Sequence, residues 1–179
     1  MKKILVLSTS PRKGSNSDML ADEFILGARE AGHDVEKIFL REKDIRFCRG
    51  CLACQKTQSC VIHDDAAAIV RSMQQAEVLV FATPIYYYGM CGQMKTLLDR
   101  ANPLFPAEYA FRDVYLLAAA ADENESAVDG AVTGLSGWIS CFDKSRLRGV
   151  VRGVGATLPG DIRQNPAALE AARQMGRQA

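Results

Sequence analysis

The sequence has no excess of charge of either sign and no block of like charge. Its 179 residues include 22 basic and 21 acidic side chains, which leaves a net charge of +1. Nucleic-acid-binding proteins usually carry a basic patch, and membrane-surface segments are usually basic and amphipathic. We therefore expect no nucleic-acid or membrane partner, and we expect a small molecule or another subunit instead.

Long apolar runs are also lacking. The opening MKKILVLSTS has two lysines and then apolar residues, but this run is too short for the core of a signal peptide. No other apolar segment is long enough to span a membrane. We expect a cytoplasmic protein, in which the six cysteines point to metal or redox chemistry rather than to disulfides.

Two common phosphate-binding patterns are missing. The chain contains neither the Walker pattern G-x-x-x-x-G-K-[ST] nor a G-x-G-x-x-G fingerprint. Their absence weakens a nucleoside triphosphate or an ordinary dinucleotide as ligand. The loop after the first apolar run is SPRKGSNSD, at residues 10–18, and it also lacks a cysteine. This absence argues against a phosphatase that carries a cysteine nucleophile in a loop of similar shape.

Apolar runs alternate with helical patterns along most of the chain, as in βαβ units that form a parallel sheet. The length fits one domain, residues 1–179. We predict a doubly wound five-stranded sheet in the order 2-1-3-4-5, whose ligand site lies at the carboxyl ends of the strands. The predicted strands are 4–8, 35–40, 77–83, 114–120 and 150–156, and the predicted helices are 16–32, 65–76, 91–101, 124–142 and 166–177.

The loop after the first predicted strand has the parts of an anion site. Arg12 stands among hydroxyl and amide side chains where a helix should begin. Exposed N–H groups and the positive end of the helix dipole favour an anion there, and arginine can form a bidentate contact with phosphate. An ordinary strand-to-helix turn capped by serine and asparagine explains the same residues.

The loop after the third predicted strand, ATPIYYYG at residues 82–89, has flat apolar side chains beside backbone N–H groups. A flat ring-shaped ligand would need both a stacking surface and hydrogen bonds at its edge. Pro84 cannot donate a ladder hydrogen bond, so the chain should turn outward there. Three consecutive tyrosines point in different directions, however, and at least one of them is expected to cover a core or a subunit contact.

The stretch STSPRKGSNS (residues 8–17) resembles the phosphate loop of the flavodoxin-like NAD(P)H-dependent FMN reductase and iron-sulfur flavoprotein families, whose usual form is G-S-P-R-x-x-G-N-T. Thr9 and Ser15 replace its glycines, and Ser17 replaces its threonine. The segment ATPIYYYGMCGQMKTLLDR (residues 82–100) resembles a second motif of these families. The resemblance implies that the FMN phosphate is held by Ser10, Arg12, Ser15, Asn16 and Ser17. It implies that the flavin ring is held by Thr83, Pro84, Ile85, Tyr86, Tyr87, Gly89, Ala121 and Asp122.

Four cysteines lie between the second strand and the second helix. Cys48, Cys51, Cys54 and Cys60 have the spacing C-x2-C-x2-C-x5-C, which suits a 4Fe-4S cubane better than the paired C-x2-C motifs of zinc sites. The spacing also matches the compact motif of iron-sulfur flavoproteins. Free thiols packed at an interface, an adventitious disulfide or a zinc site explain the same residues, because similar segments occur in reductases without a cluster.

The resemblance implies an FMN-binding oxidoreductase that takes a hydride from NADH or NADPH and passes electrons to a quinone, a flavin or a redox protein. The flavin carries the chemistry, so we expect no catalytic side chain. It also implies a homodimer or homotetramer. We expect residues 102–111 and the cysteine loop to contribute to the subunit contact, because they are long and carry aromatic residues. One alternative is an iron-sulfur flavoprotein electron carrier, and another is a non-enzymatic flavin-binding redox sensor that uses its thiols.

Overall fold

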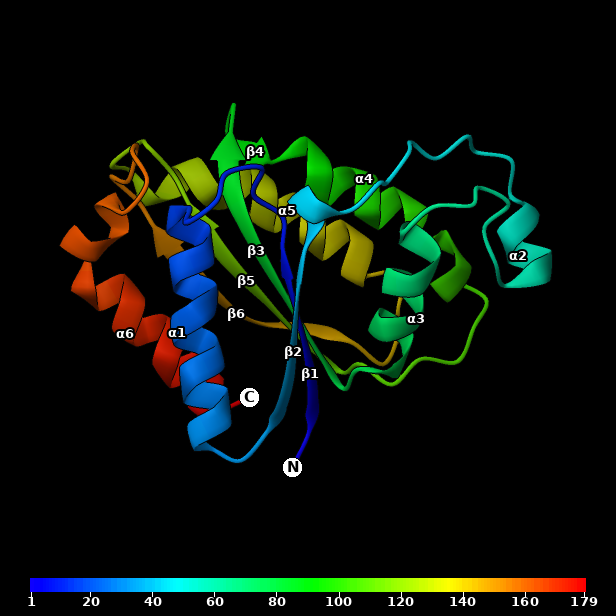
Figure 1. Ribbon diagram of the computed structural model, residues 1–179, viewed down its shortest axis with the longest axis horizontal. Helices are drawn as coiled ribbons and strands as arrows, with labels where there is room; N and C mark the ends of the chain where they lie inside the picture. The colour runs from blue at the N-terminus through cyan, green and yellow to red at the C-terminus, as the bar shows by residue number, and fades with distance from the viewer.

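The computed structural model describes residues 1–179, which form a central sheet with helices on both faces (Figure 1). The parallel strands are β1 (Lys3–Ser8), β2 (Asp34–Phe39), β3 (Val78–Tyr86), β5 (Asp113–Ala119) and β6 (Arg146–Gly153). They lie in the order β2-β1-β3-β5-β6. Because β4 lies off this path, the order is the predicted 2-1-3-4-5, and the flavodoxin-like class is confirmed.

Alternate residues of each strand face opposite layers of helices, as the period of two requires. Ile4 and Val6 pack with α1 (Asn16–Glu30) and α6 (Pro166–Arg177), while Leu5 and Leu7 belong to the core on the other face. That second core is covered by α3 (Ala66–Gln75), α4 (Gly92–Arg100) and α5 (Asp129–Ile139). The central strands are therefore buried on both faces.

The helix ends follow from local chemistry. Ser15 caps α1 by accepting a hydrogen bond from the Asp18 N–H, and Gly32 ends that helix with a φ of 82°. Asn165 accepts a hydrogen bond from the Ala168 N–H at the start of α6, where Pro166 is the first helical residue. These ends match the sequence prediction. None of the helices is both long enough and apolar enough to span a membrane.

Several boundaries and short elements differ from the prediction. The last strand begins at Arg146 rather than at residue 150, because this strand lies at the sheet edge and tolerates exposed arginines. The expected helix over 124–142 is a 3-10 turn followed by a shorter helix. No sequence pattern indicated the other short pieces: the strand β4 (Gly89–Met90), the helix α2 (Ala53–Thr57) and the 3-10 turns η1 (Leu40–Glu42), η2 (Asn102–Leu104), η3 (Glu125–Val128) and η4 (Asp161–Gln164).

Candidate functional site

The winding of the sheet reverses between β1 and β3, and a cavity of about 150 Å³ opens at their carboxyl ends. Doubly wound sheets bind ligands at this point, because the loops on either side diverge there. The loops after β1, β3, β5 and β6 all contribute to the wall. The lining residues are Ser10, Arg12, Ser15, Asn16, Ser17, Pro84, Ile85, Tyr86, Ala119, Ala121, Ala156, Thr157 and Pro159.

The loop after β1 presents donors without protein acceptors. The backbone N–H groups of residues 13–17 donate to no acceptor in the protein, although Ser15, Asn16 and Ser17 are buried. These groups lie at the N-terminus of the 15-residue helix α1, where the helix dipole adds positive potential. Buried unpaired donors are costly, so this arrangement suits an anion of the size of a phosphate.

The Asn16 side chain connects this loop to the loop after β6. Its Nδ2 group donates to the carbonyls of Ala156 at 3.1 Å and Leu158 at 2.9 Å. Its Oδ1 atom accepts from the N–H groups of Gly160 at 2.9 Å and Ile162 at 3.2 Å. The amide is thus fully occupied by protein groups. Of Asn16, only the backbone N–H is left to bind an anion, while the side chain fixes the far wall of the cavity.

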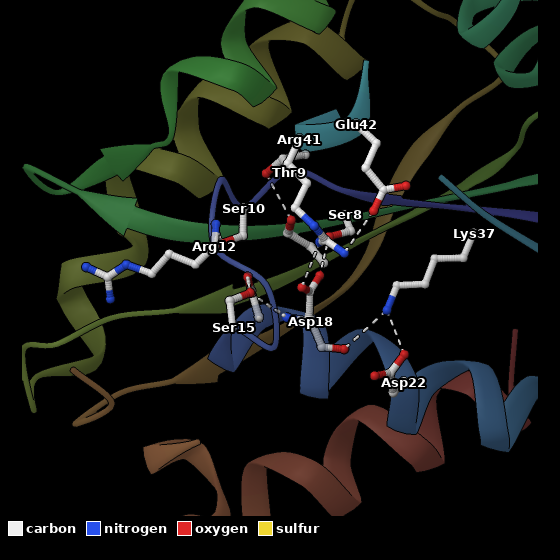
Figure 2. Close-up of polar contacts among 12 residues, drawn as sticks. Ser8, Thr9, Ser10, Arg12, Ser15, Asp18, Asp22, Lys37, Arg41 and Glu42 are labelled. Carbon is white, nitrogen blue, oxygen red and sulfur yellow. Dashed lines mark hydrogen bonds and ion pairs between the residues drawn. The ribbon is translucent and has the colours of Figure 1, made fainter. Parts of the chain in front are cut away.

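The buried carboxylate of Asp18 lies behind the loop after β1 (Figure 2). Asp18 accepts a hydrogen bond from the Ser8 hydroxyl and forms an ion pair with Arg41 at 3.2 Å. The Arg41 guanidinium lies 4.1 Å from the centre of the Phe39 ring, which limits its movement. Figure 2 shows Arg41 pointing toward Asp18, whereas Arg12 extends away from this pair. The charge of Asp18 is therefore balanced by Arg41, which leaves Arg12 available to a ligand.

The opposite wall consists of Pro84, Ile85 and Tyr86 at the end of β3. A tight hairpin to β4 follows, in which Tyr87 and Tyr88 have φ values of 49° and 62°. Non-glycine residues rarely adopt this left-handed region, and each costs about 1 kcal/mol or more. The Tyr88 hydroxyl donates to Asp122 at 3.2 Å, so the hairpin is tied to the loop after β5.

The same hairpin packs directly on helix α5. A Cβ atom at Gly130 would lie 2.2 Å from the Tyr88 carbonyl oxygen, so only glycine allows this approach. Tyr87 projects fully into solvent, with a relative exposure of 102 %. Contacts at Tyr88 therefore hold the strained turn, and Tyr87 is left free for contacts outside the monomer.

Thr83 and Cys91 form a buried connection beneath the two loops. The Thr83 hydroxyl accepts from the Cys91 N–H at 3.2 Å, and the Cys91 Sγ atom lies 3.2 Å from the Thr9 hydroxyl. Neither Thr83 nor Cys91 reaches the cavity wall. These contacts fix the relative position of the loops after β1 and β3, which together form the site.

The structure brings nine of the thirteen sequence-predicted flavin-site residues to the cavity wall. Thr83, Tyr87, Gly89 and Asp122 do not line it, although Thr83 and Asp122 hold loops that do. Sequence reasoning missed Ala119, Ala156, Thr157 and Pro159, which line the cavity. Gly155 and Gly160 lie on either side of the last three residues, and both have positive φ values. These two glycines were the only indication of a tight loop in the sequence.

The four predicted cluster thiols lie around a second cavity of about 460 Å³, together with Cys141, Trp138 and Phe142. Cys48 and Cys51 are exposed, Cys54 is buried and Cys60 is half-buried. No three of the chain's His, Cys, Asp or Glu side chains converge closely enough to hold a metal ion. Helix α2, which carries Cys54, lies at the opposite end of the molecule from the loops after β5 and β6 (Figure 1).

The cysteine loop is fastened by a buried ion pair. Arg100 forms two hydrogen bonds with Asp64, at 2.6 and 2.9 Å, and its Nη1 also donates to the Arg46 carbonyl at 2.6 Å. Burial raises the pKa of Asp64, but hydrogen bonds from Arg100 and from the N–H groups of Arg46 and Ala66 outweigh it and lower the pKa to about 2. Hydrogen bonding to Asp64 raises the pKa of Arg100, as does the neighbouring Cys60 when ionised.

This ion pair predicts an acid-sensitive contribution to stability. Because the pKa of Asp64 is lower in the folded chain than its ordinary value of 3.8, its contribution is present above pH 3.8 and is lost as the pH falls through about 2. The shift corresponds to roughly 2 kcal/mol. Urea denaturation between pH 5 and pH 2 should show a shallower loss of stability in Asp64→Asn than in the wild type. Equal slopes would contradict the prediction.

A doubly wound sheet in this strand order, with unpaired N–H groups after its first strand, defines a flavodoxin-like protein. The family model described as NADPH-dependent FMN reductase matches residues 2–155. The chain belongs to this family, and the resemblance read from the two loops is confirmed.

Relatives agree with this assignment, and a solved structure agrees with the fold. An iron-sulfur flavoprotein of Methanocaldococcus jannaschii is 34% identical over 57% of this chain and 53% of its own length. A Bacillus subtilis protein, YwqN, whose name describes an NAD(P)H-dependent FMN-containing oxidoreductase, is 29% identical over 97% of this chain and 96% of its own. The crystal structure of an azoreductase from Bacillus anthracis superposes with a TM-score of 0.77 at 17% identity, covering 100% of both chains. The chain spans about half the length of the iron-sulfur flavoproteins that it matches.

Proposed function

We propose that the protein binds FMN in the cavity after β1, with the phosphate at the N-terminus of α1. The observation that carries this proposal is the set of N–H groups at residues 13–17 that have no protein acceptor, three of which belong to the buried residues Ser15, Asn16 and Ser17. A phosphate would accept from several of them at once, and the hydroxyls of Ser10, Ser15 and Ser17 line the same wall. Arg12, also in the wall, adds a cation that is not paired with a carboxylate.

The flavin ring would lie along the ends of β3 and β5. Pro84, Ile85 and Tyr86 offer an apolar edge there, and Ala119 and Ala121 are small enough for a ring to approach the backbone. Thr83, Gly89 and Asp122 would support this edge from behind, and Tyr87 would reach outward toward a substrate or subunit. The ring would thus meet protein on one side and remain open to a second reactant.

We propose that the protein is an NAD(P)H-dependent oxidoreductase. Bound FMN would supply the redox chemistry, accepting a hydride from NADH or NADPH and passing electrons to a quinone, a free flavin or a redox protein. The residues of this chain hold the phosphate, orient the ring and limit the access of water. The YwqN match, which covers nearly both whole chains, supports this reading. No side chain is assigned a proton-transfer or nucleophilic role.

Anaerobic mixing tests the activity. The FMN-loaded protein should lose its oxidised flavin absorbance when NADPH or NADH is added, and a soluble benzoquinone should restore it over repeated cycles. A flavin that neither nicotinamide reduces would contradict the proposal. Such a result, together with reversible oxidation of the thiols, would favour a flavin-binding redox sensor.

Replacing Arg12 by Met should weaken FMN binding about 10-fold, because one charge-assisted contact to the phosphate is lost. Riboflavin lacks the phosphate, so it should bind the wild type and the Arg12→Met variant with equal affinity. Lys13→Met is the matched control, since Lys13 is a neighbouring exposed cation that does not line the cavity. Isothermal calorimetry on the apoprotein measures each affinity. Equal losses in the two variants would show that only net charge matters.

A second candidate function, an electron carrier with a 4Fe-4S cluster, is favoured because Cys48, Cys51, Cys54 and Cys60 line one cavity. The thiols do not converge in this structure, so cluster binding would require the loop to close. The loop has three residues with positive φ, namely Gly50, Leu52 and Gln58. Anaerobic purification should give a brown protein with iron and sulfide near four per chain. A yellow protein without iron would contradict the cluster.

We further propose that residues 1–179 form one domain, that the protein acts in the cytoplasm and that it assembles as a homodimer or homotetramer. The exposed side chains of Tyr87, Phe47 and Phe105 support a subunit contact, since aromatic residues are enriched at interfaces. Sedimentation at several concentrations tests the assembly. A monomer at every concentration would contradict it.

A further inference from the structure

A third cavity, of about 200 Å³, shares Cys60 with the cavity lined by the four cysteines of the loop, which we call the thiol cavity. It is bounded by the loop after α2, by α3 and by the end of α4. Its lining residues are Gln58, Ser59, Cys60, Ala67, Val70, Arg71, Gln74, Arg100, Pro103 and Leu104. No acidic residue is among them, and none of them lines the proposed FMN cavity. We call this the arginine cavity.

Arg100 gives the arginine cavity a buried donor without a partner. The residue is 1 % exposed, and its two Nη atoms are occupied by Asp64 and by the carbonyls of Arg46 and Ile62. Its Nε atom is buried and has no hydrogen-bond acceptor. A buried guanidinium N–H without an acceptor is unfavourable, so an oxygen ligand at this point would be stabilised.

Arg71 supplies a second cation. It is exposed on α3, and it takes part in none of the chain's ion pairs or side-chain hydrogen bonds. The Gln58 amide and the Ser59 hydroxyl also have no side-chain partner in the protein. The polar part of the wall therefore offers donors from several directions. The carboxylate of Asp64 binds the Nη atoms of Arg100 but does not line the cavity, so the donors of the wall favour an anion.

The rest of the wall decides what kind of anion fits. Ala67, Val70, Pro103 and Leu104 form an apolar surface opposite the donors. Inorganic phosphate or sulfate would leave this surface against water, whereas a carboxylate on a short carbon chain would cover it. We propose that the arginine cavity binds a short-chain aliphatic carboxylate, with its oxygens between Arg71 and Arg100.

Binding here would affect Cys60, which lines both the arginine cavity and the thiol cavity. The positive charge of Arg100 is already balanced by Asp64, so a carboxylate bound here would place a negative charge near the Cys60 sulfur and cover one side of it. The arginine cavity would then connect the level of an organic acid to the chemistry of the thiols. This site does not depend on FMN binding or on the proposed activity.

Calorimetry with butyrate tests the site on protein saturated with FMN, so that the proposed phosphate cradle is already filled. We expect one saturable site, with affinity rising about 4-fold for each methylene from acetate to butyrate. Arg71→Gln should weaken butyrate binding about 10-fold. Arg29→Gln is the matched control, because Arg29 is also exposed and unpaired but lies on α1, across the sheet. It should bind butyrate like the wild type.

Several results would overturn the proposal. If butyrate shows no saturable binding, the proposed site does not exist. If inorganic phosphate binds more tightly than butyrate, the ligand class is not an aliphatic carboxylate. Equal losses in Arg71→Gln and Arg29→Gln would indicate a general effect of net charge. Arg71 is exposed, so its substitution is not expected to unfold the chain. Each outcome can be read without any activity assay, so it is separate from the proposed function.

Discussion

Replacing Asn16 by Ala is expected to lower the free energy of unfolding by about 2–4 kcal/mol and to weaken FMN binding about 100-fold. The side chain makes four hydrogen bonds to the loop over residues 156–162, and it is only 7 % exposed. Its loss leaves buried donors and acceptors unpaired, each costing about 1–3 kcal/mol before water compensates. Urea denaturation and FMN titration measure the two effects.

FMN affinity should fall because the loop after β6 forms one wall of the cavity. Ala156, Thr157 and Pro159 line it, and Arg12 Nη1 donates to the Thr157 carbonyl at 3.3 Å. Once this loop is free to move, binding must first order it. Asn16→Asp is the control, because a carboxylate still accepts from the two N–H groups but cannot donate to the two carbonyls. It should give intermediate stability. An Ala variant with wild-type stability and affinity would show that the clamp has no role.

Replacing Arg100 by Met is expected to destabilise the protein by about 3–5 kcal/mol. The substitution leaves the Asp64 carboxylate without its main partner, and both side chains are 0% exposed in the structure. Removing one member of a buried ion pair is costly because the remaining charge stays desolvated. Denaturation in urea at neutral pH should show the loss as a lower midpoint with an unchanged slope.

A double variant separates the charge from the packing. Arg100→Met combined with Asp64→Asn removes both charges and keeps a side-chain oxygen for the N–H groups of Arg46 and Ala66, so it should be more stable than Arg100→Met alone. The carbonyls of Arg46 and Ile62, which accept from Arg100, lose their donor in both proteins and do not affect the comparison. A double variant that is no more stable than Arg100→Met would show that the ion pair itself contributes little.

The parts of the fold that depend on hydrophobic pattern could be predicted from the sequence. The run ILVLS has one apolar side chain for each face of the sheet in turn, and such runs recur between helical segments. The start of α1 was also predictable, because Ser15 followed by a helical pattern is a recognisable cap. Local chemistry decides these features, so the neighbouring residues are sufficient evidence.

Features that depend on distant segments could not be predicted in this way. The Asn16 amide was assigned to phosphate, yet in the structure it binds a loop more than 140 residues later in the chain. Asp18 and Arg41, which pair behind the site, gave no signal as partners. The hairpin at Tyr87 and Tyr88 has the left-handed backbone usual for glycine, and close packing on Gly130 accounts for it only once the structure is known.

The spacing of the cysteines also predicted only part of the structure of their loop. It predicted that four thiols share one loop, and they do line one cavity. Spacing does not fix the backbone between cysteines, and two residues there adopt left-handed conformations that no pattern indicated, namely Leu52 and Gln58. Whether the loop closes around a cluster therefore depends on a conformation that spacing alone does not determine.

The central claim is that the N-terminus of α1 holds the phosphate of FMN, and comparing FMN with riboflavin on the apoprotein tests it most directly. The two flavins share the ring and the ribityl chain, so the difference in affinity reports the phosphate contacts alone. We expect FMN to bind about 100-fold more tightly, since several charge-assisted hydrogen bonds are at stake. Equal affinities for FMN and riboflavin would contradict the proposed site.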